Sequence, residues 1–233
     1  ALNAADGTYK WHFQTMHHDL WDRDLPAPPN LVTVTKNGKR IDAVAQITKQ
    51  GTVFVFNRET GEPLFPINEI EAIPSLLTGE QAWPTQPVPS LPKPFARKAN
   101  QLSENDISPF ANNKEELKNI LMNSDKRLFA PPDTTTVLLL PGYDGGAEYG
   151  GAGADPDNGI IYVNANEIAW FLRMEKREEL LAVNNANTQL SAGEQTYRIY
   201  CAVCHGIDRK GNAASGTADL STLQQKHNQQ YAH

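Results

Sequence analysis

A short unit of strand, tight turn and strand recurs along the first 170 residues, and it restricts the fold more than any other feature of the sequence. Its clearest copy lies in residues 43–65, where an alternating run ends at Lys49, a Gln50-Gly51 turn follows, and residues 52–57 are mostly apolar. Alternation with a period of two is the pattern of a strand. The sequence therefore predicts an antiparallel strand pair here, with Val and Phe on both faces of the second strand.

A glycine followed four residues later by an aromatic side chain marks further copies of the unit. Gly61 precedes Phe65 in this way, and Gly7 precedes Trp11 within residues 1–14. Residues 155–164 give a third echo, a D-P-D-N-G turn followed by I-I-Y-V-N. Repeats of ~40–50 residues built from short strands are typical of a β-propeller, which needs at least ~4 blades. The predicted fold class is therefore mainly β, a partial propeller.

The repeat is interrupted by residues 66–135, which we interpret as an inserted loop region on one face of the blades. The stretch is rich in proline at residues 84–94. It also holds one segment, residues 108–124, whose apolar positions fit a helical period.

A second motif, C-A-V-C-H at residues 201–205, matches the attachment signature of a c-type haem. On a helix Cys201 and Cys204 share a face, and His205 is placed to bind the iron. Ser191 and Glu194 form a capping box that predicts the start of a helix running through residues 195–203. The alternatives are a redox or structural disulfide and half of a zinc site. Zinc would need a second ligand pair, and the chain has only 2 cysteines.

The residues after this motif contain no methionine to serve as the second axial ligand, and His227 and His233 are the only downstream histidines. Residues 197–212 resemble the opening of a class I cytochrome c domain. We therefore expect residues 192–233 to be the helical front part of such a domain, joined to the blades (residues 1–170) by a linker at 171–191. The distal ligand of the haem would lie outside this chain.

Composition excludes several classes of function. A formal net charge of -6 argues against nucleic acid as a partner. No apolar run is long enough to cross a membrane, so we expect no transmembrane segment in this chain. Haem attachment to C-x-x-C-H is normally periplasmic in bacteria, which predicts a periplasmic location.

Residues 17–26, H-H-D-L-W-D-R-D-L-P, gather three acids, two histidines and a tryptophan. By composition alone this is a solvated acidic loop around a buried Trp21 or a functional site. Together with other stretches it resembles the dehydrogenases that depend on pyrroloquinoline quinone (PQQ), in particular the membrane glucose dehydrogenase and quinohaemoprotein branches. The matching stretches are WHFQTMHHDLWDRDLPAPPNL, VAQITKQGTVFVFNRETGEPLFPI, AWPTQPVPSLPKPFA and PGYDGGAEYGGAGADPDNGIIYVN.

The resemblance implies an eight-bladed propeller with PQQ in its central channel. Residues 1–170 would be its C-terminal blades, followed by the cytochrome segment. The residues that stack on PQQ and most calcium ligands would lie upstream. We therefore expect the isolated fragment to be inactive and its open strand edges to promote self-association.

The resemblance also implies roles for individual residues. Asp22 occupies the position of the general base that takes the substrate hydroxyl proton, close to a Ca²⁺ ion. Lys49 occupies the position of the cation that contacts the quinone oxygens, although it could also be an ordinary turn lysine. Glu148 and Tyr149 stand where the family has an Asn-Trp pair, and with Gly150 they would approach PQQ.

His17 and His18 could be metal ligands, but calcium prefers oxygen. We expect them to shape the mouth of the site, with one of them packed against Trp21.

The functional hypothesis is part of a PQQ-dependent dehydrogenase that oxidises an alcohol or aldose. Electrons would pass to a covalently bound haem c and then to a downstream acceptor, a cytochrome or a quinone. The implied cofactors are PQQ, calcium and haem c. The alternative is a non-catalytic, propeller-like binding module fused to an electron-transfer cytochrome. We expect the loops that form the substrate pocket to lie mostly outside this chain, so the sequence does not identify the substrate.

Overall fold

The computed structural model describes residues 1–156, 158–175, 191–211 and 217–221 of the 233-residue chain. The chain divides into two compact units, Ala1–Met174 and Glu175–His233. Their boundary falls inside the predicted linker at 171–191. In the described residues, no helix is long and apolar enough to cross a membrane.

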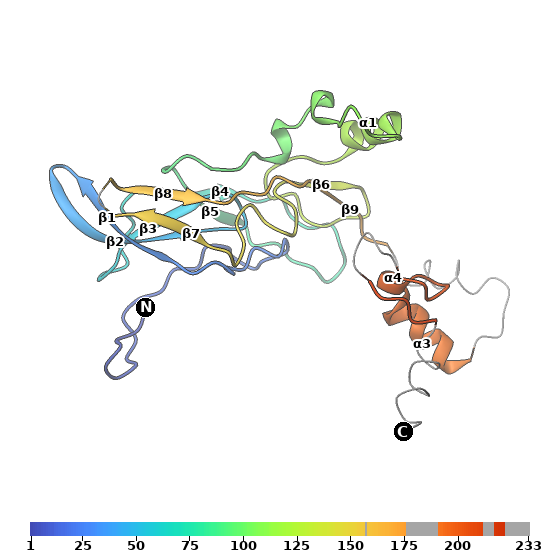
Figure 1. The fold of residues 1–233 in the computed structure, drawn as a ribbon, viewed down its shortest axis with the longest axis horizontal. Helices are drawn as coiled ribbons and strands as arrows, with labels where there is room; N and C mark the ends of the chain where they lie inside the picture. The colour runs from blue at the N-terminus through green and yellow to red at the C-terminus, as the bar shows by residue number, and fades with distance from the viewer. Residues whose placement is uncertain (157, 176–190, 212–216, 222–233) are drawn as a thin grey trace, which may run out of the picture. The chain divides into compact units, whose positions relative to one another are not determined.

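The first unit is built from small antiparallel sheets (Figure 1). The largest has the order β1-β2-β3, with bounds β1 Asn30–Lys36, β2 Lys39–Ile47 and β3 Val53–Asn57. The turn between β1 and β2 is Asn37-Gly38, and both residues have positive φ, 52° and 73°. That conformation is the preferred two-residue hairpin turn, and Asn-Gly is its preferred sequence.

The predicted strand pair around the Gln50-Gly51 turn is confirmed as β2 and β3, which pair from Ala43↔Asn57 to Ile47↔Val53. In β2 the buried residues alternate, as expected for a half-buried strand. In β3 both faces are covered, because Val53 and Val55 join an aliphatic core while Phe54 and Phe56 lie against Phe13. The burial of both faces explains the continuous apolar run.

The third predicted copy of the unit, at residues 155–164, is also confirmed. Strands β7 (Ala152–Asp155) and β8 (Ile160–Val163) form a hairpin, with Gly159 at φ 66° in the turn. Strand β7 lies beside β1. The apolar run at residues 136–140 contains strand β6 (Val137–Leu139), which pairs with β9 (Trp170–Leu172).

The N-terminal copy of the unit differs from the prediction. Residues 1–14 form no named strand, and a single bridge joins Leu2 to Tyr9. The reason is that Trp11 packs on the next copy instead. Its ring lies 5.7 Å from Phe56, its Nε1–H donates to the carbonyl oxygen of Arg58, and it fills the space where a Cβ on Gly61 would stand.

The stretch at 66–135 contains more regular structure than the inserted loop we expected. Strands β4 (Ile67–Glu71) and β5 (Thr85–Pro89) form a two-stranded sheet that was not predicted. Two short 3-10 helices follow, η1 (Ala99–Gln101) and η2 (Glu104–Asp106). The predicted helix is present as α1 (Lys114–Asn123), six residues shorter at its N-terminus, and Leu121 packs it onto Leu138 of β6.

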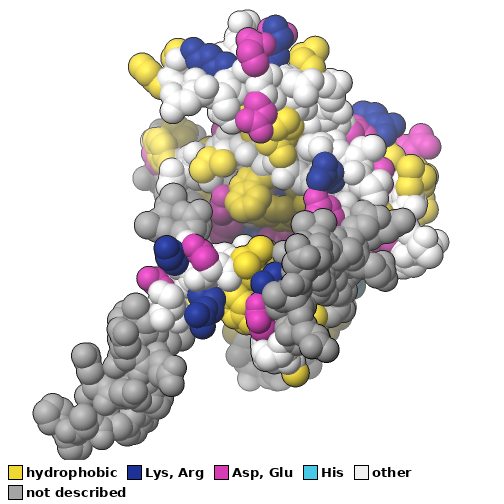
Figure 2. Space-filling model, turned by 90° about the vertical axis from the view of Figure 1, so that its right-hand side faces the viewer, with side chains coloured by type: hydrophobic (Ala, Val, Ile, Leu, Met, Phe, Trp, Pro, Cys, Tyr) yellow, Lys and Arg dark blue, Asp and Glu magenta, His cyan; other side chains and the backbone are white. Residues whose placement is uncertain are grey.

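Within the described residues, none of the four sheets closes into a ring. Strands β1 and β3 are both edges of their sheet. Several large hydrophobic side chains stay exposed, among them Leu31, Leu76 and Phe110. Figure 2 shows hydrophobic side chains in the open among charged ones on one face of the molecule. Open edges and exposed apolar side chains fit our expectation that the fragment self-associates, which stays a prediction.

The described part of the second unit contains helices α3 (Ala192–Tyr200) and α4 (Ala202–His205). The predicted cap is confirmed, since the Ser191 hydroxyl oxygen accepts a hydrogen bond of 3.2 Å from the backbone N–H of Glu194. The prediction of one uninterrupted helix through residues 195–203 is wrong. Cys201, with φ at -117°, lies outside ideal helical values and separates the two helices.

Candidate active site

The acidic loop after His18 is held in shape by its own first carboxylate. Asp19 accepts hydrogen bonds from the backbone N–H groups of Trp21 and Arg23. Trp21 is buried, and its indole N–H donates to the carbonyl oxygen of Ala130 over 2.7 Å. Between these two anchors Asp22 adopts a left-handed φ of 58°, which is uncommon for a residue other than glycine. The loop therefore fixes where the Asp22 side chain emerges.

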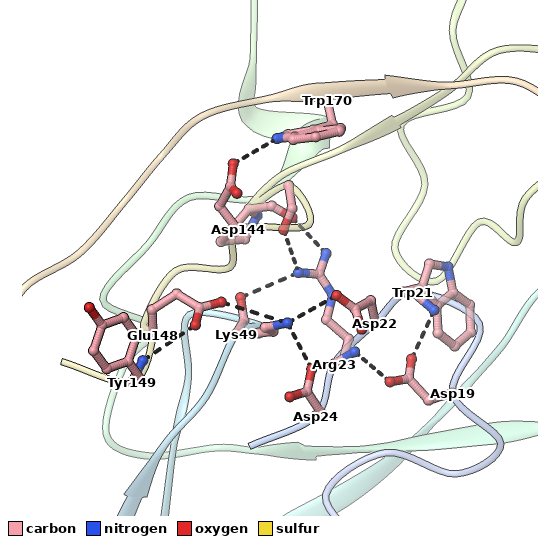
Figure 3. A network of polar contacts seen from close by, with 12 residues as sticks. Asp19, Trp21, Asp22, Arg23, Asp24, Lys49, Asp144, Glu148, Tyr149 and Trp170 are labelled. Atoms are coloured by element: carbon pink, nitrogen blue, oxygen red, sulfur yellow. Dashed lines mark hydrogen bonds and ion pairs between the residues drawn. The ribbon is translucent and has the colours of Figure 1, made fainter. Parts of the chain in front are cut away.

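Lys49 is the centre of a cluster of carboxylates (Figure 3). Its Nζ lies 3.0 Å from Oδ2 of Asp22, 2.7 Å from Oδ1 of Asp24 and 3.6 Å from Oε1 of Glu148. Lys49 is only 7% exposed, whereas the Asp22 side chain is 56% exposed. The structure thus brings together three segments that the sequence separates, with the cation inside and the acids on the solvent side.

The protonation of Lys49 follows from this arrangement. Burial alone would lower the pKa of Lys49. The hydrogen bonds to Asp24 and Asp22, with the charges of these two acids, outweigh burial and raise that pKa above its usual value. Lys49 is therefore a fixed ammonium over the whole physiological pH range.

A close backbone contact holds the turn that carries Lys49. The backbone N–H of Gly146 donates to the carbonyl oxygen of Lys49 over 2.7 Å. Gly145 has a φ of 72°, and a Cβ placed on it would stand 2.5 Å from Cγ of Lys49. A Cβ on Gly146 would stand 2.9 Å from Cα of Gly51. Only glycines allow the 142–146 segment to approach Lys49 this closely.

Arg23 lies beneath the cluster and is buried, at 7% exposure. Its guanidinium donates to three backbone carbonyl oxygens, those of Pro141 at 2.6 Å, Gly142 at 3.0 Å and Lys49 at 3.4 Å. Burial lowers the pKa of Arg23, and the charge of Asp19 opposes this effect. One side chain therefore ties the acidic loop to both segments that meet at Lys49.

A cavity of about 500 Å³ opens beside Asp22. It combines acidic, apolar and aromatic side chains, and its lining residues are Asp19, Leu20, Asp22, Leu77, Glu80, Pro132, Tyr143 and Met174. Burial raises the pKa of Tyr143, so its hydroxyl stays protonated and can donate a hydrogen bond. The cavity is large enough for a small organic molecule next to a carboxylate.

The three residues predicted at the glycine-rich segment have different surroundings. Glu148 joins the Lys49 cluster. Tyr149 is 82% exposed, and its backbone N–H donates to the Glu148 carboxylate. A Cβ on Gly150 would meet nothing within 4 Å, so the described chain does not itself require glycine there.

The hydrogen-bond donors of the site fit an anionic quinone at one position, the ammonium of Lys49. Lys49 has three N–H donors, and two of them bond Asp22 and Asp24. Glu148 lies beyond hydrogen-bond distance at 3.6 Å. One ammonium proton is therefore left for an acceptor such as a quinone oxygen.

The two histidines of the loop pair with acids rather than with Trp21. Nε2 of His17 lies 3.2 Å from Glu69, and its ring packs on Trp83. Nε2 of His18 lies 3.1 Å from Glu80, a residue of the cavity beside Asp22. The expectation that one histidine packs against Trp21 is wrong, because Phe129 covers that ring.

The residues that the structure describes do not by themselves form a calcium site. Among them, no group of three or more His, Cys, Asp or Glu side chains could hold a metal ion. Asp22 and Asp24 both point to the Lys49 ammonium, which occupies the place a cation would take.

The C-x-x-C-H motif lies in the second unit. Cys201 and Cys204 are free thiols; Cys201 is half-buried and Cys204 is exposed. Nδ1 of His205 lies 2.9 Å from the carbonyl oxygen of Ala218, which favours a proton on Nδ1 and leaves the Nε2 lone pair available to a metal. These features fit the attachment of a haem.

Two residues of the site were not predicted from the sequence. Asp24 binds Lys49 more closely than Asp22 does, and Arg23 organises the backbone around both. The D-R-D pattern could have indicated Asp24, because it places a second carboxylate two residues after Asp22 in the same loop. No local pattern indicates Arg23, since its partners lie up to 119 positions away.

Comparisons with known proteins identify relatives of this chain. The family model "Glucose/ethanol/alcohol dehydrogenase, beta-propeller domain" matches residues 1–215. The quinoprotein glucose dehydrogenase of Gluconobacter oxydans is 35% identical over 167 residues, which cover 70% of this chain and 20% of that protein. The probable quinate dehydrogenase (quinone) of Xanthomonas campestris is 33% identical over 177 residues, covering 75% and 22%.

Among solved structures, the quinohemoprotein alcohol dehydrogenase of Comamonas testosteroni matches 76% of this chain and 20% of its own, with a TM-score of 0.44 and 19% identity. The chain therefore spans about a fifth of the length of the first relatives it matches.

Proposed function

Because this chain belongs to the glucose/ethanol/alcohol dehydrogenase β-propeller family, we propose that it forms part of a PQQ-dependent dehydrogenase acting on a small alcohol or aldose. The observation that carries the proposal is the pair formed by Asp22 and Lys49 beside a cavity of about 500 Å³. A carboxylate at a cavity and a fixed ammonium behind it are the two groups that the oxidation of a carbinol requires from this part of the protein.

Asp22 acts as the general base. Its Oδ2 is bonded to Lys49, so its Oδ1 is the atom that takes the proton of the substrate hydroxyl. The left-handed loop and the anchors around it hold this carboxylate at the cavity. A positioned base of this kind contributes roughly 10²–10⁴-fold to the rate.

Lys49 has two tasks. It holds the carboxylates of Asp22 and Asp24 in place, and it offers its remaining N–H to an oxygen of the cofactor. When bound, PQQ supplies the acceptor for the hydride that leaves the carbinol carbon. Because Lys49 remains protonated, it favours negative charge on that acceptor without any proton transfer of its own.

Calcium enters no step of this proposal. The described residues do not offer it a site, and any ion near Asp22 would need ligands from other segments or other residues of the protein.

We also propose that the second unit carries a haem c through Cys201 and Cys204, with His205 as proximal ligand. The free thiols and the hydrogen bond from Nδ1 support this assignment. The haem would receive electrons from the dehydrogenase part and deliver them to an external acceptor. Attachment of such a haem would place the protein in the periplasm.

The proposed function is tested by reconstitution. The full-length protein is titrated with PQQ, and reduction of an artificial dye is then followed with an aldose, glycerol or quinate as substrate. We expect PQQ-dependent dye reduction with at least one of these compounds and none without PQQ. Dye reduction that persists without PQQ, or failure of PQQ to bind, would contradict the proposal.

A further inference from the structure

Two consecutive residues hold the two ends of one lysine. The carboxylate of Asp22 bonds Nζ of Lys49, and the guanidinium of Arg23 bonds its backbone carbonyl oxygen (Figure 3). The same guanidinium holds Pro141 and Gly142, which precede Gly145, the glycine packed against the Lys49 side chain. Arg23 thus contacts each backbone segment that decides where the Lys49 ammonium lies.

The three carbonyl oxygens do not need Arg23 as their only donor. Lys49 O also accepts from the N–H of Gly146 at 2.7 Å, and Gly142 O accepts from the N–H of Gly145 at 2.9 Å. Only Pro141 O has Arg23 as its single recorded partner among the described residues. Two of the three carbonyl oxygens that accept from Arg23 therefore already have another hydrogen-bond donor.

Burying the guanidinium of Arg23 at this position costs free energy. In the part of the chain that the structure describes, no carboxylate oxygen makes an ion pair with its guanidinium. The charge of Asp19 offsets only part of the cost of burying this cation, and an apolar residue of similar size is often as stable as a buried charge. A role in stability alone does not explain it.

We propose that Arg23 is a positioning residue that sets the place of Lys49 relative to Asp22; the inference rests on the proposed function of that pair. The planar fork of arginine can reach three carbonyls at once, which a lysine ammonium on a flexible chain cannot do in the same geometry. Loss of the fork lets the 48–51 turn and the 141–146 segment move apart, and the Lys49 ammonium leaves its carboxylates.

The first test reads the position of Lys49 without any catalysis. The full-length protein is treated briefly with acetic anhydride, and acetylation of Lys49 is measured by mass spectrometry in wild type, Arg23→Met and Arg23→Lys. Arg97→Met is the matched control, because Arg97 also joins distant segments, through Asp106 and Glu167, but lies outside the site. We expect faster acetylation of Lys49 in both Arg23 variants and wild-type acetylation in the control.

The second test separates positioning from stability. With PQQ and substrate, we expect Arg23→Met to lower kcat by roughly 10²-fold while KM changes less than about threefold, the size expected for a displacement of about 1 Å. Any fall in its melting temperature should be too small to unfold the protein at the assay temperature, because only the Pro141 carbonyl oxygen loses its single donor. Arg23→Lys should not restore kcat, whereas it would restore a role that needs only a buried positive charge.

Unchanged acetylation of Lys49 in folded Arg23 variants would overturn the inference. So would an Arg23→Lys variant with wild-type kcat, or a loss of kcat that only follows a lower melting temperature. If Arg23→Met does not fold, acetylation of Lys49 and kcat are both measured on Arg23→Lys, which keeps the charge and the aliphatic stem. Changed acetylation in a protein with no PQQ-dependent activity would leave Arg23 as the organiser of Lys49 and reject the proposed function separately.

Discussion

The Nζ atom of Lys49 lies 3.0 Å from Oδ2 of Asp22, although 27 positions separate the two residues in the sequence. Lys49 lies in the turn that follows β2, and Asp22 stands at a left-handed position in an acidic loop. Their contact joins the proposed base to the proposed cofactor cation.

Replacing Lys49 with methionine should weaken PQQ binding and reduce stability. Asp22, Asp24 and Glu148 would lose the cation that they share. Because these acids are about half exposed, we expect a loss of only about 1 kcal/mol in the free energy of unfolding. Urea unfolding and PQQ titration measure the two effects. Lys93→Met, at an exposed lysine, is the control, and unchanged PQQ affinity in Lys49→Met would argue against the cofactor role.

Replacing Gly145 with alanine should disturb the same lysine from the other side. Alanine would have to adopt a φ of 72°, and its Cβ would stand 2.5 Å from Cγ of Lys49. We expect a loss of about 1–3 kcal/mol in the free energy of unfolding and faster acetylation of Lys49. Gly153→Ala, whose Cβ would meet nothing within 4 Å, should lose no stability. Equal melting temperatures for Gly145→Ala and wild type would show that the contact between Gly145 and the Lys49 side chain leaves room for a Cβ.

Lys98 gives a prediction about pH. Burial, with a smaller effect from the charge of Arg23, lowers the pKa of Lys98 to about 8, although its ammonium bonds the carbonyl oxygen of Gln50. The unfolded chain then holds more protons than the folded one between pH 8 and the ordinary lysine value, so this residue makes stability rise with pH in that window.

Lys98→Met should therefore melt at a higher temperature than wild type at pH 7, and its advantage should shrink as the pH rises from 8 to about 10. Thermal melts at several pH values measure this. The control Lys93→Met should show no such trend. A constant difference between Lys98→Met and wild type at all these pH values would mean that Lys98 keeps its ordinary protonation in the folded state.

Haem attachment gives a prediction for the second unit. Expressed with a cytochrome maturation system, the full-length protein should show covalent haem on a denaturing gel. The double variant Cys201→Ser, Cys204→Ser should show none, because serine cannot form the thioether bonds. Tyr200→Phe, a change beside the motif, should leave the stain intact. Equal staining of the double variant would refute the assignment.

The sequence predicted those parts of the fold that local patterns determine. The strand pair around Gln50-Gly51 and the hairpin closed by Gly159 follow from short-range alternation and turn residues. Asn37-Gly38 is an equally strong hairpin signal, and the strand β1 that it implies was not predicted. Strand β4 is mostly polar and exposed, and β5 contains two prolines, so neither had a recognisable strand pattern.

The site was predictable only through the family resemblance. That resemblance selected Asp22 and Lys49, and the structure places them in contact. It could not select Arg23, whose role depends on carbonyl groups that every residue carries. Packing also decided the N-terminal segment, where Trp11 finds its place on Gly61 instead of forming another hairpin.

The most direct test of the central claim is the single-turnover rate of the full-length, PQQ-loaded protein, compared among wild type, Asp22→Asn and Asp24→Asn after rapid mixing with substrate. Asp24 also binds Lys49 but does not line the cavity, which makes it the matched control. We predict that Asp22→Asn binds PQQ as wild type does but reduces it roughly 10²–10⁴-fold more slowly, whereas Asp24→Asn loses less than about tenfold. An Asp22→Asn variant that turns over at the wild-type rate would contradict the account.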